Sequence, residues 1–294
     1  MSELKDLRIQ LSLSVPPDHL KLAIPARELD RAMLTVCMTL VRAGATVVYG
    51  GDLRPDGFTF KIFRHLASAY ADQDTVPFIH VLNQPSLSKL SYETLAQALR
   101  ERRGTCQTYL PSEGKMIPIR LGDDEIVVGS RTGSTLIRDS NAFDTWSSRL
   151  KTKTISDAST DAREAIAEFV HASVLIGGKM GIEEIDGDLY VGKMPGIIEE
   201  ALMMLKSNKP VIPLGAYGGA TRDLAVALGL LEESQRVPRG SQTSSYSSGV
   251  EEARRYNDRI PPHLRSRLTS VAQDDRAEFV AKEIVQIISQ WRNP

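Results

Sequence analysis

Three glycine pairs follow short apolar runs of the chain, each at a point where a strand is expected to end. They are Gly50-Gly51 before Asp52, Gly177-Gly178 before Lys179, and Gly218-Gly219 before Thr221. Glycine tolerates positive φ and lets backbone N–H groups approach a phosphate closely. Helix N-termini bind anions for the same reason. The pattern therefore predicts a phosphate-binding edge of a sheet.

Four further residues are expected at the same edge. Ser12 and Ser14 end the first predicted strand, and Pro195-Gly196 opens a predicted helix. Asp52 and Thr221, which follow two of the glycine pairs, each have an ordinary alternative role. Asp52 is expected either to bind a ribose hydroxyl or to form a local turn, and Thr221 either to contact phosphate or to cap a helix.

Two common nucleotide motifs are missing from these turns. No Gly-x-Gly-x-x-Gly follows the first predicted strand, and the chain has no Gly-x-x-x-x-Gly-Lys-Ser/Thr. These motifs are typical of dinucleotide dehydrogenases and nucleoside triphosphatases. Hydride transfer and phosphoryl transfer are therefore disfavoured, and we expect no cofactor and no metal site.

Alternating strand and helix patterns must position the turns. Apolar residues alternate over 7–15, recur at helical spacing over 28–43, and form a short run over 46–49. The order resumes with helices at 160–172, 195–206 and 220–228 and strands at 173–176 and 210–214. Such crossovers join parallel strands. The sequence predicts an α/β fold: a doubly wound, mostly parallel, Rossmann-like sheet with helices on both faces.

The domain organisation follows from changes in composition. Residues 1–231 form one predicted ligand-binding domain, within which 104–158 lack clean periodicity and are interpreted as an elaboration. Residues 232–249 are rich in Ser, Gln, Gly and Arg and are expected to form a mobile loop. Residues 250–294 are expected to form a helical tail packed on the domain.

Composition restricts the partners and the compartment. Lys and Arg total 36 against 37 Asp and Glu, which leaves no basic surface for duplex nucleic acid. The two cysteines, Cys37 and Cys106, match no zinc or redox spacing and are expected to be free thiols. No run of 18 apolar residues and no signal peptide is present. We expect a cytoplasmic protein that binds neither membrane nor nucleic acid.

Several segments resemble the SLOG superfamily, the Rossmann-like group that includes DprA and the LOG enzymes. They are Ser12-Leu13-Ser14, the segment 48–59, and the segment 194–202. The resemblance covers roughly residues 7–228, and it is strongest to the prokaryotic TRPM-like branch. It implies a ligand such as ADP-ribose, NAD or a cyclic relative.

The same resemblance implies two catalytic residues. LOG enzymes carry Pro-Gly-Gly-x-Gly-Thr-x-x-Glu after a buried strand and an essential Arg on the helix before it. Arg163 and Glu200 match these positions, with Ile197 in place of the motif's Thr. A second copy of the segment, at 178–184, makes Glu184 an alternative to Glu200.

Three classes of function remain open. The first is a module that binds or senses a nucleotide or NAD-derived ligand and acts through self-assembly or a separately encoded partner. The second is a LOG-type nucleotide phosphoribohydrolase that uses Arg163 and Glu200. The third is an interaction scaffold. The altered motif favours the first class.

Overall fold

The computed structural model describes residues 3–51, 62, 76–102, 104–130, 133–150, 153–190, 192–236 and 240–292. Within these residues nine strands form a sheet in the order β7-β6-β5-β4-β3-β2-β1-β8-β9. Internal contacts divide the chain into two compact units. Unit 1 comprises Met1–Ala45 and Val170–Pro294, and unit 2 comprises Thr46–Phe169. The sequence pattern predicts a ligand-binding domain over 1–231, a loop over 232–249 and a helical tail over 250–294.

Unit 1 contains three parallel strands at one end of this order. They are β1 (Arg8–Ser14), β8 (Ala172–Gly177) and β9 (Val211–Leu214). Every residue of β8 and β9 is buried. Strands buried on both faces are covered by helices on both sides, as in other doubly wound folds. This confirms the predicted α/β class.

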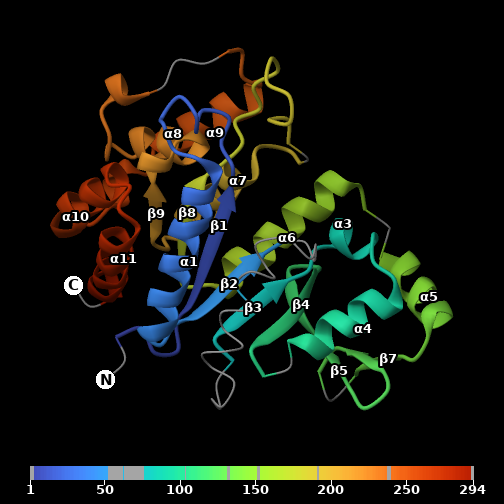
Figure 1. Cartoon of the computed structure of the whole chain (residues 1–294). Coiled ribbons are helices and arrows are strands. Elements are labelled where there is room, and N and C mark those ends of the chain that lie inside the picture. The colour runs from blue at the N-terminus through green and yellow to red at the C-terminus, as the bar shows by residue number, and fades with distance from the viewer. Residues whose placement is uncertain are drawn as a thin grey trace. The chain divides into compact units, whose positions relative to one another are not determined.

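The helices of unit 1 include α1 (Ala26–Arg42), which buries Leu29, Met33, Val36 and Leu40 at helical spacing. The others are α7 (Gly196–Lys206), α8 (Gly219–Ala227), α9 (Ser244–Arg254), α10 (Pro262–Gln273) and α11 (Ala277–Arg292), with 3-10 turns at Gly215–Tyr217, Glu233–Gln235 and Asn257–Arg259. Helix α11 lies beside α1 and α10 (Figure 1). Among the described helices, none combines the length and hydrophobicity needed to cross a bilayer.

Helix α9 occupies part of the segment for which the sequence predicts a loop. The helix begins at Ser244, and Tyr246 is only 1% exposed. The Tyr246 hydroxyl donates to Asp223 Oδ2 of α8 at 2.6 Å. A partner in α8 therefore fixes residues whose composition alone is typical of a loop.

Unit 2 combines parallel and antiparallel pairing. Strands β2 (Thr46–Gly50), β3 (Phe78–Val81) and β4 (Cys106–Ser112) are parallel, and β5 (Lys115–Leu121), β6 (Ile126–Val128) and β7 (Thr135–Ile137) follow in antiparallel pairing. The helices are α3 (Gln84–Leu87), α4 (Tyr92–Glu101), α5 (Ser140–Leu150) and α6 (Ile155–Phe169). Strands β5 to β7 and α5 make up most of the predicted elaboration. The sequence also indicates a helix near 58–70, a range that lies outside the described residues except for position 62.

The strand order contains one reversal that matters for function. After β1 the chain adds β2 to one side, and β8 later joins the other side of β1. In open α/β sheets, ligands bind beyond the carboxyl ends of the strands at such a switch point. A ligand is therefore expected beyond the carboxyl ends of β1 and β8.

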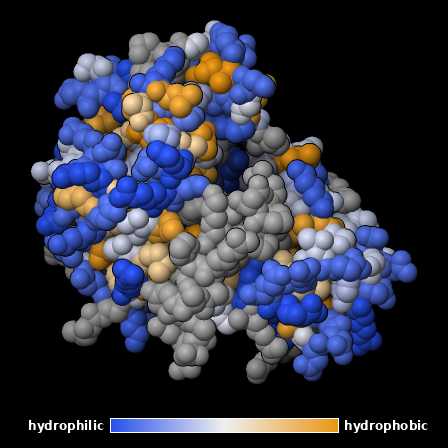
Figure 2. All heavy atoms as spheres, viewed as in Figure 1, coloured by the Kyte–Doolittle hydropathy of each residue, from blue (hydrophilic) through white to orange (hydrophobic). Residues whose placement is uncertain are grey.

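The described residues visible in Figure 2 are mostly hydrophilic, with small hydrophobic spots between them. The most exposed large hydrophobic side chains of unit 1 are Leu20 at 74% and Leu189 at 59%. Leu20 lies in the segment between β1 and α1, and Leu189 lies in the segment between β8 and α7.

His80 on β3 is a titratable group inside the core of unit 2. Its side chain is fully buried, and Nε2 donates to the Gly51 carbonyl at 2.8 Å. Burial, reinforced by the Arg102 guanidinium, lowers the pKa of His80 from 6.5 to about 3. The neutral imidazole is thus part of the folded state.

This burial predicts a loss of stability in acid. The unfolded chain takes up a proton at His80 near pH 6.5, whereas the folded chain does so only near pH 3, so stability falls as the pH drops through that window. In urea unfolding at about pH 7 and about pH 4.5, His80→Gln should lose less stability on acidification than the wild type, because glutamine keeps the donor to Gly51 without titrating. Equal losses would contradict the assignment.

Candidate functional site

The turn after β8 is built directly against the end of β1. Ser14 pairs with Gly177, and the Gly178 N–H donates to the Ser14 carbonyl at 2.9 Å. Gly177 has φ +67° and Gly178 has φ +106°. A Cβ on Gly177 would strike Ser14 O and lie 2.9 Å from Pro16 Cδ. Only glycine fits this junction.

The turn after β9, at Gly218-Gly219, packs against the turn after β8, at Gly177-Gly178. Gly218 and Gly219 have φ values of +80° and +63°, and a Cβ on Gly219 would strike the Gly178 carbonyl. The Ala220 N–H donates to that same carbonyl at 3.2 Å. Two of the three glycine pairs predicted to share a site therefore touch each other.

Two helix N-termini meet at Gly178. A Cβ there would lie 2.9 Å from Ile197 Cδ1 in the first turn of α7 and 3.0 Å from Ala220 Cβ in the first turn of α8. Pro195 precedes α7, and Gly196 is its first residue. The positive ends of two helix dipoles thus lie against one glycine turn, which favours a negative charge there.

Two carboxylates of the chain bind backbone N–H groups, one within the Gly218-Gly219 turn and one just after the Gly177-Gly178 turn. Asp18, in the loop after β1, accepts from the Gly219 N–H at 2.8 Å. Asp188 accepts from the Met180 N–H at 3.2 Å and from the Ile182 N–H at 2.8 Å. Sequence reasoning missed both residues. The available signal was an acid within each segment that adjoins the predicted turns.

The segment 181–190, which we call the strap, is fastened to residues 240–245. Ile182 forms an antiparallel bridge with Gln242, and the Tyr190 hydroxyl is 2.9 Å from Thr243 Oγ1. The Glu184 carboxylate accepts from the Ser241 N–H at 3.1 Å, which lowers its pKa. This motif alternative to Glu200 is therefore engaged in holding the strap.

Glu200 is oriented from β1. Gln10, only 3% exposed, donates from Nε2 to Glu200 Oε2 at 3.0 Å. Arg163 lies half-buried on α6 in unit 2.

The other predicted site residues take varied positions. Thr221 is fully buried, and Lys179 Nζ donates to the Leu189 carbonyl at 2.9 Å. Ser12 and Ser14 are half-buried on β1. Gly50 and Gly51, at the end of β2, belong to unit 2, and Asp52 lies outside the described residues.

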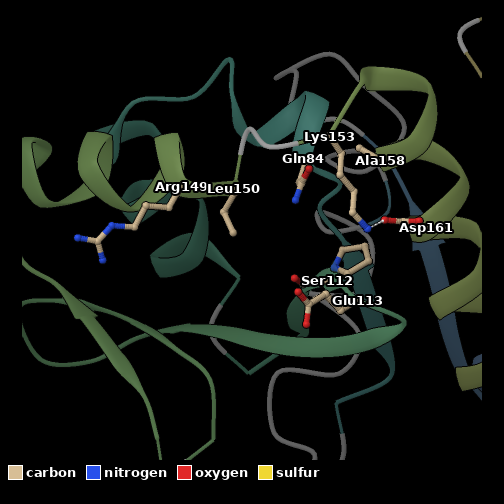
Figure 3. A pocket seen from close by; sticks show the side chains of 9 residues that line it. Gln84, Ser112, Glu113, Arg149, Leu150, Lys153, Ala158 and Asp161 are labelled. Carbon is tan, nitrogen blue, oxygen red and sulfur yellow. Dashed lines mark hydrogen bonds and ion pairs between the residues drawn. The ribbon is translucent and has the colours of Figure 1, made fainter.

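Unit 2 has a cavity of its own near the carboxyl ends of β3 and β4, of about 120 Å³. Figure 3 shows Lys153 reaching toward Asp161, while Arg149 extends away from the other labelled residues. The Asp161 carboxylate raises the pKa of Lys153. Sites for drug-sized ligands measure roughly 300 to 1,000 Å³. This cavity is too small for a nucleotide.

The fold is that of a Rossmann-like α/β protein, and the family match supports a nucleotide-related function. Residues 3–260 match the model of the family SLOG cluster2, and the chain belongs to that family of the SLOG superfamily. The match extends beyond residue 231 to include the strap's partner segment and α9. No curated protein matches the chain.

The junction of the two turns predicts a contrast between glycines. Gly219 and Gly187 both have positive φ, but a Cβ on Gly187 meets nothing within 4 Å, whereas one on Gly219 would also lie 2.5 Å from Pro16 Cβ. Gly187→Ala should cost about 1 to 2 kcal/mol from backbone strain. Gly219→Ala should cost about 1 to 3 kcal/mol more from overpacking. Urea unfolding measures both, and equal losses would contradict the close packing.

Proposed function

We propose that this chain binds a nucleotide or NAD-derived ligand of the ADP-ribose kind, with its phosphates at the joined turns 177–178 and 218–219. One observation carries the proposal: the Gly219 N–H already binds the Asp18 carboxylate where the N-termini of α7 and α8 meet, and the Met180 and Ile182 N–H groups just after Gly177-Gly178 bind Asp188. Groups that bind a carboxylate also bind a phosphate oxygen. A base and ribose would extend along the carboxyl ends of the strands.

A sensing role follows from the altered motif. Ile197 replaces the motif's Thr, its side chain packs on Gly178, and the strap interrupts the segment. These features favour binding without turnover, as in the TRPM-like branch that the sequence resembles. Output would then pass through self-assembly or a separately encoded partner.

A second candidate is the LOG-type phosphoribohydrolase, favoured by the Gln10 contact with Glu200. A carboxylate fixed by a buried amide is oriented to stabilise an oxocarbenium-like centre. In this case the sugar–base bond of a nucleotide is cleaved by water.

Calorimetry and chromatography on the same samples distinguish the two functions. Wild-type protein with ADP-ribose, NAD, AMP and adenosine should bind the phosphorylated compounds in preference to adenosine and release no free base. Base release that falls by orders of magnitude in Glu200→Gln, but not in Glu251→Gln on α9, would instead establish the hydrolase. Absence of binding by every phosphorylated compound would refute the proposal.

The arginine implied by the family has its own test. Arg163→Ala should weaken binding of ADP-ribose by about 1.5 to 3 kcal/mol, as expected for a hydrogen bond to a charged group, and leave adenosine unaffected. Arg100→Ala, on α4 of the same unit, is the matched control. If Arg163→Ala and Arg100→Ala bind ADP-ribose with the same affinity, Arg163 does not bind the phosphate.

A further inference from the structure

Asp18 occupies the anion position at the start of α8. Its side chain is 2% exposed, and Oδ1 lies 2.8 Å from the N–H of Gly219, the first residue of the helix. A Cβ on Gly218 would lie 2.7 Å from the same oxygen. The two glycines therefore leave room for a carboxylate to sit on the turn, and the chain supplies one.

Asp188 is a second buried carboxylate that accepts backbone hydrogen bonds, just after the turn that follows β8. It is 4% exposed, and its carboxylate takes the N–H groups of Met180 and Ile182, on either side of Gly181 with φ +69°. Successive N–H groups around a left-handed residue form a concave anion-binding surface. Asp188 belongs to the strap, the segment that interrupts the family motif, and it binds N–H groups on both sides of Gly181.

The two carboxylates interact electrostatically. Burial raises the pKa of Asp188, and repulsion by Asp18 contributes to the rise. A phosphate brought to either turn would add more negative charge beside two buried acids. Like charges at short range in a buried site disfavour one another strongly. A phosphate and these carboxylates therefore compete for the same N–H groups.

The segments that bear the acids are packed on their inner sides only. Leu20, two residues after Asp18, is 74% exposed, and Leu189, next to Asp188, is 59% exposed. The strap is held to 240–245 by hydrogen bonds, each with a net value of about 0.5 to 1.5 kcal/mol, and by Ile182, which is 1% exposed and lies beside Gly240. Release of the strap therefore breaks these hydrogen bonds and exposes the side chain of Ile182.

Resting on the proposed function, we propose that Asp18 and Asp188 are internal anions, one on the Gly218-Gly219 turn and one beside the Gly177-Gly178 turn. A phosphate-bearing ligand then binds by displacing these carboxylates together with the loop after β1 and the strap. The empty protein is then kept closed by its own carboxylates. Ligand binding is coupled to release of the strap from 240–245, which gives a bound ligand a way to change the protein's surface.

The test uses inorganic pyrophosphate and ADP-ribose as probes on the full chain. Asp18→Asn and Asp188→Asn keep an acceptor for the backbone N–H groups but remove the competing charge. Each should bind pyrophosphate roughly 10-fold more tightly than the wild type by calorimetry. Asp258→Asn, an exposed aspartate of the same unit, is the control and should leave affinity unchanged. Near-ultraviolet circular dichroism verifies that each variant is folded. If only one of the two variants folds, that variant alone is enough for the test.

The outcomes separate the inference from the proposed function. Tighter pyrophosphate binding in a folded variant, without ADP-ribose binding by any protein, supports the internal anions and refutes the nucleotide ligand. Wild-type binding of ADP-ribose with no gain for either probe in Asp18→Asn and Asp188→Asn overturns the internal anions and leaves the proposed function standing. Failure of all proteins to bind either probe overturns both.

Discussion

The contact between the two glycine turns fixes the rest of unit 1. The Gly178 carbonyl receives the Ala220 N–H, and Gly219 lies too close to that carbonyl to carry a side chain. This junction sets where α7 and α8 begin and therefore where their positive ends point. Pro16 packs on the same turns, so the loop after β1 takes its position from them as well.

Buried N–H groups require hydrogen-bond acceptors, and the helix N-termini beside them favour acceptors that carry negative charge. The buried carboxylates of Asp18 and Asp188 meet this requirement through backbone hydrogen bonds. A buried unpaired donor or charge costs far more than a satisfied one. The internal acids thus have a structural role in the ligand-free protein and, under the proposal made above, a competing role when a ligand arrives.

The strap and the segment after α8 depend on one another. Ile182 bridges Gln242, Glu184 accepts from Ser241, and Tyr246 is anchored on Asp223. The family match includes this region. It is consequently a component of the same family domain as the turns, held by hydrogen bonds and by the buried side chain of Ile182.

The sequence by itself determined the α/β class, the family, and the strands β1, β8 and β9 with the helices α1, α7 and α8, because burial periodicity and glycine after strands are local properties. The turns Gly177-Gly178 and Gly218-Gly219 were predicted in one site and do meet. Tertiary structure alone decided that Asp18 and Asp188 fill them, that Gln10 holds Glu200, and that Tyr246 turns a polar stretch into helix. Each of these contacts joins residues on different elements or in loops without periodicity. A carboxylate's partner depends on which segments fold together, and no local pattern of residue types encodes that.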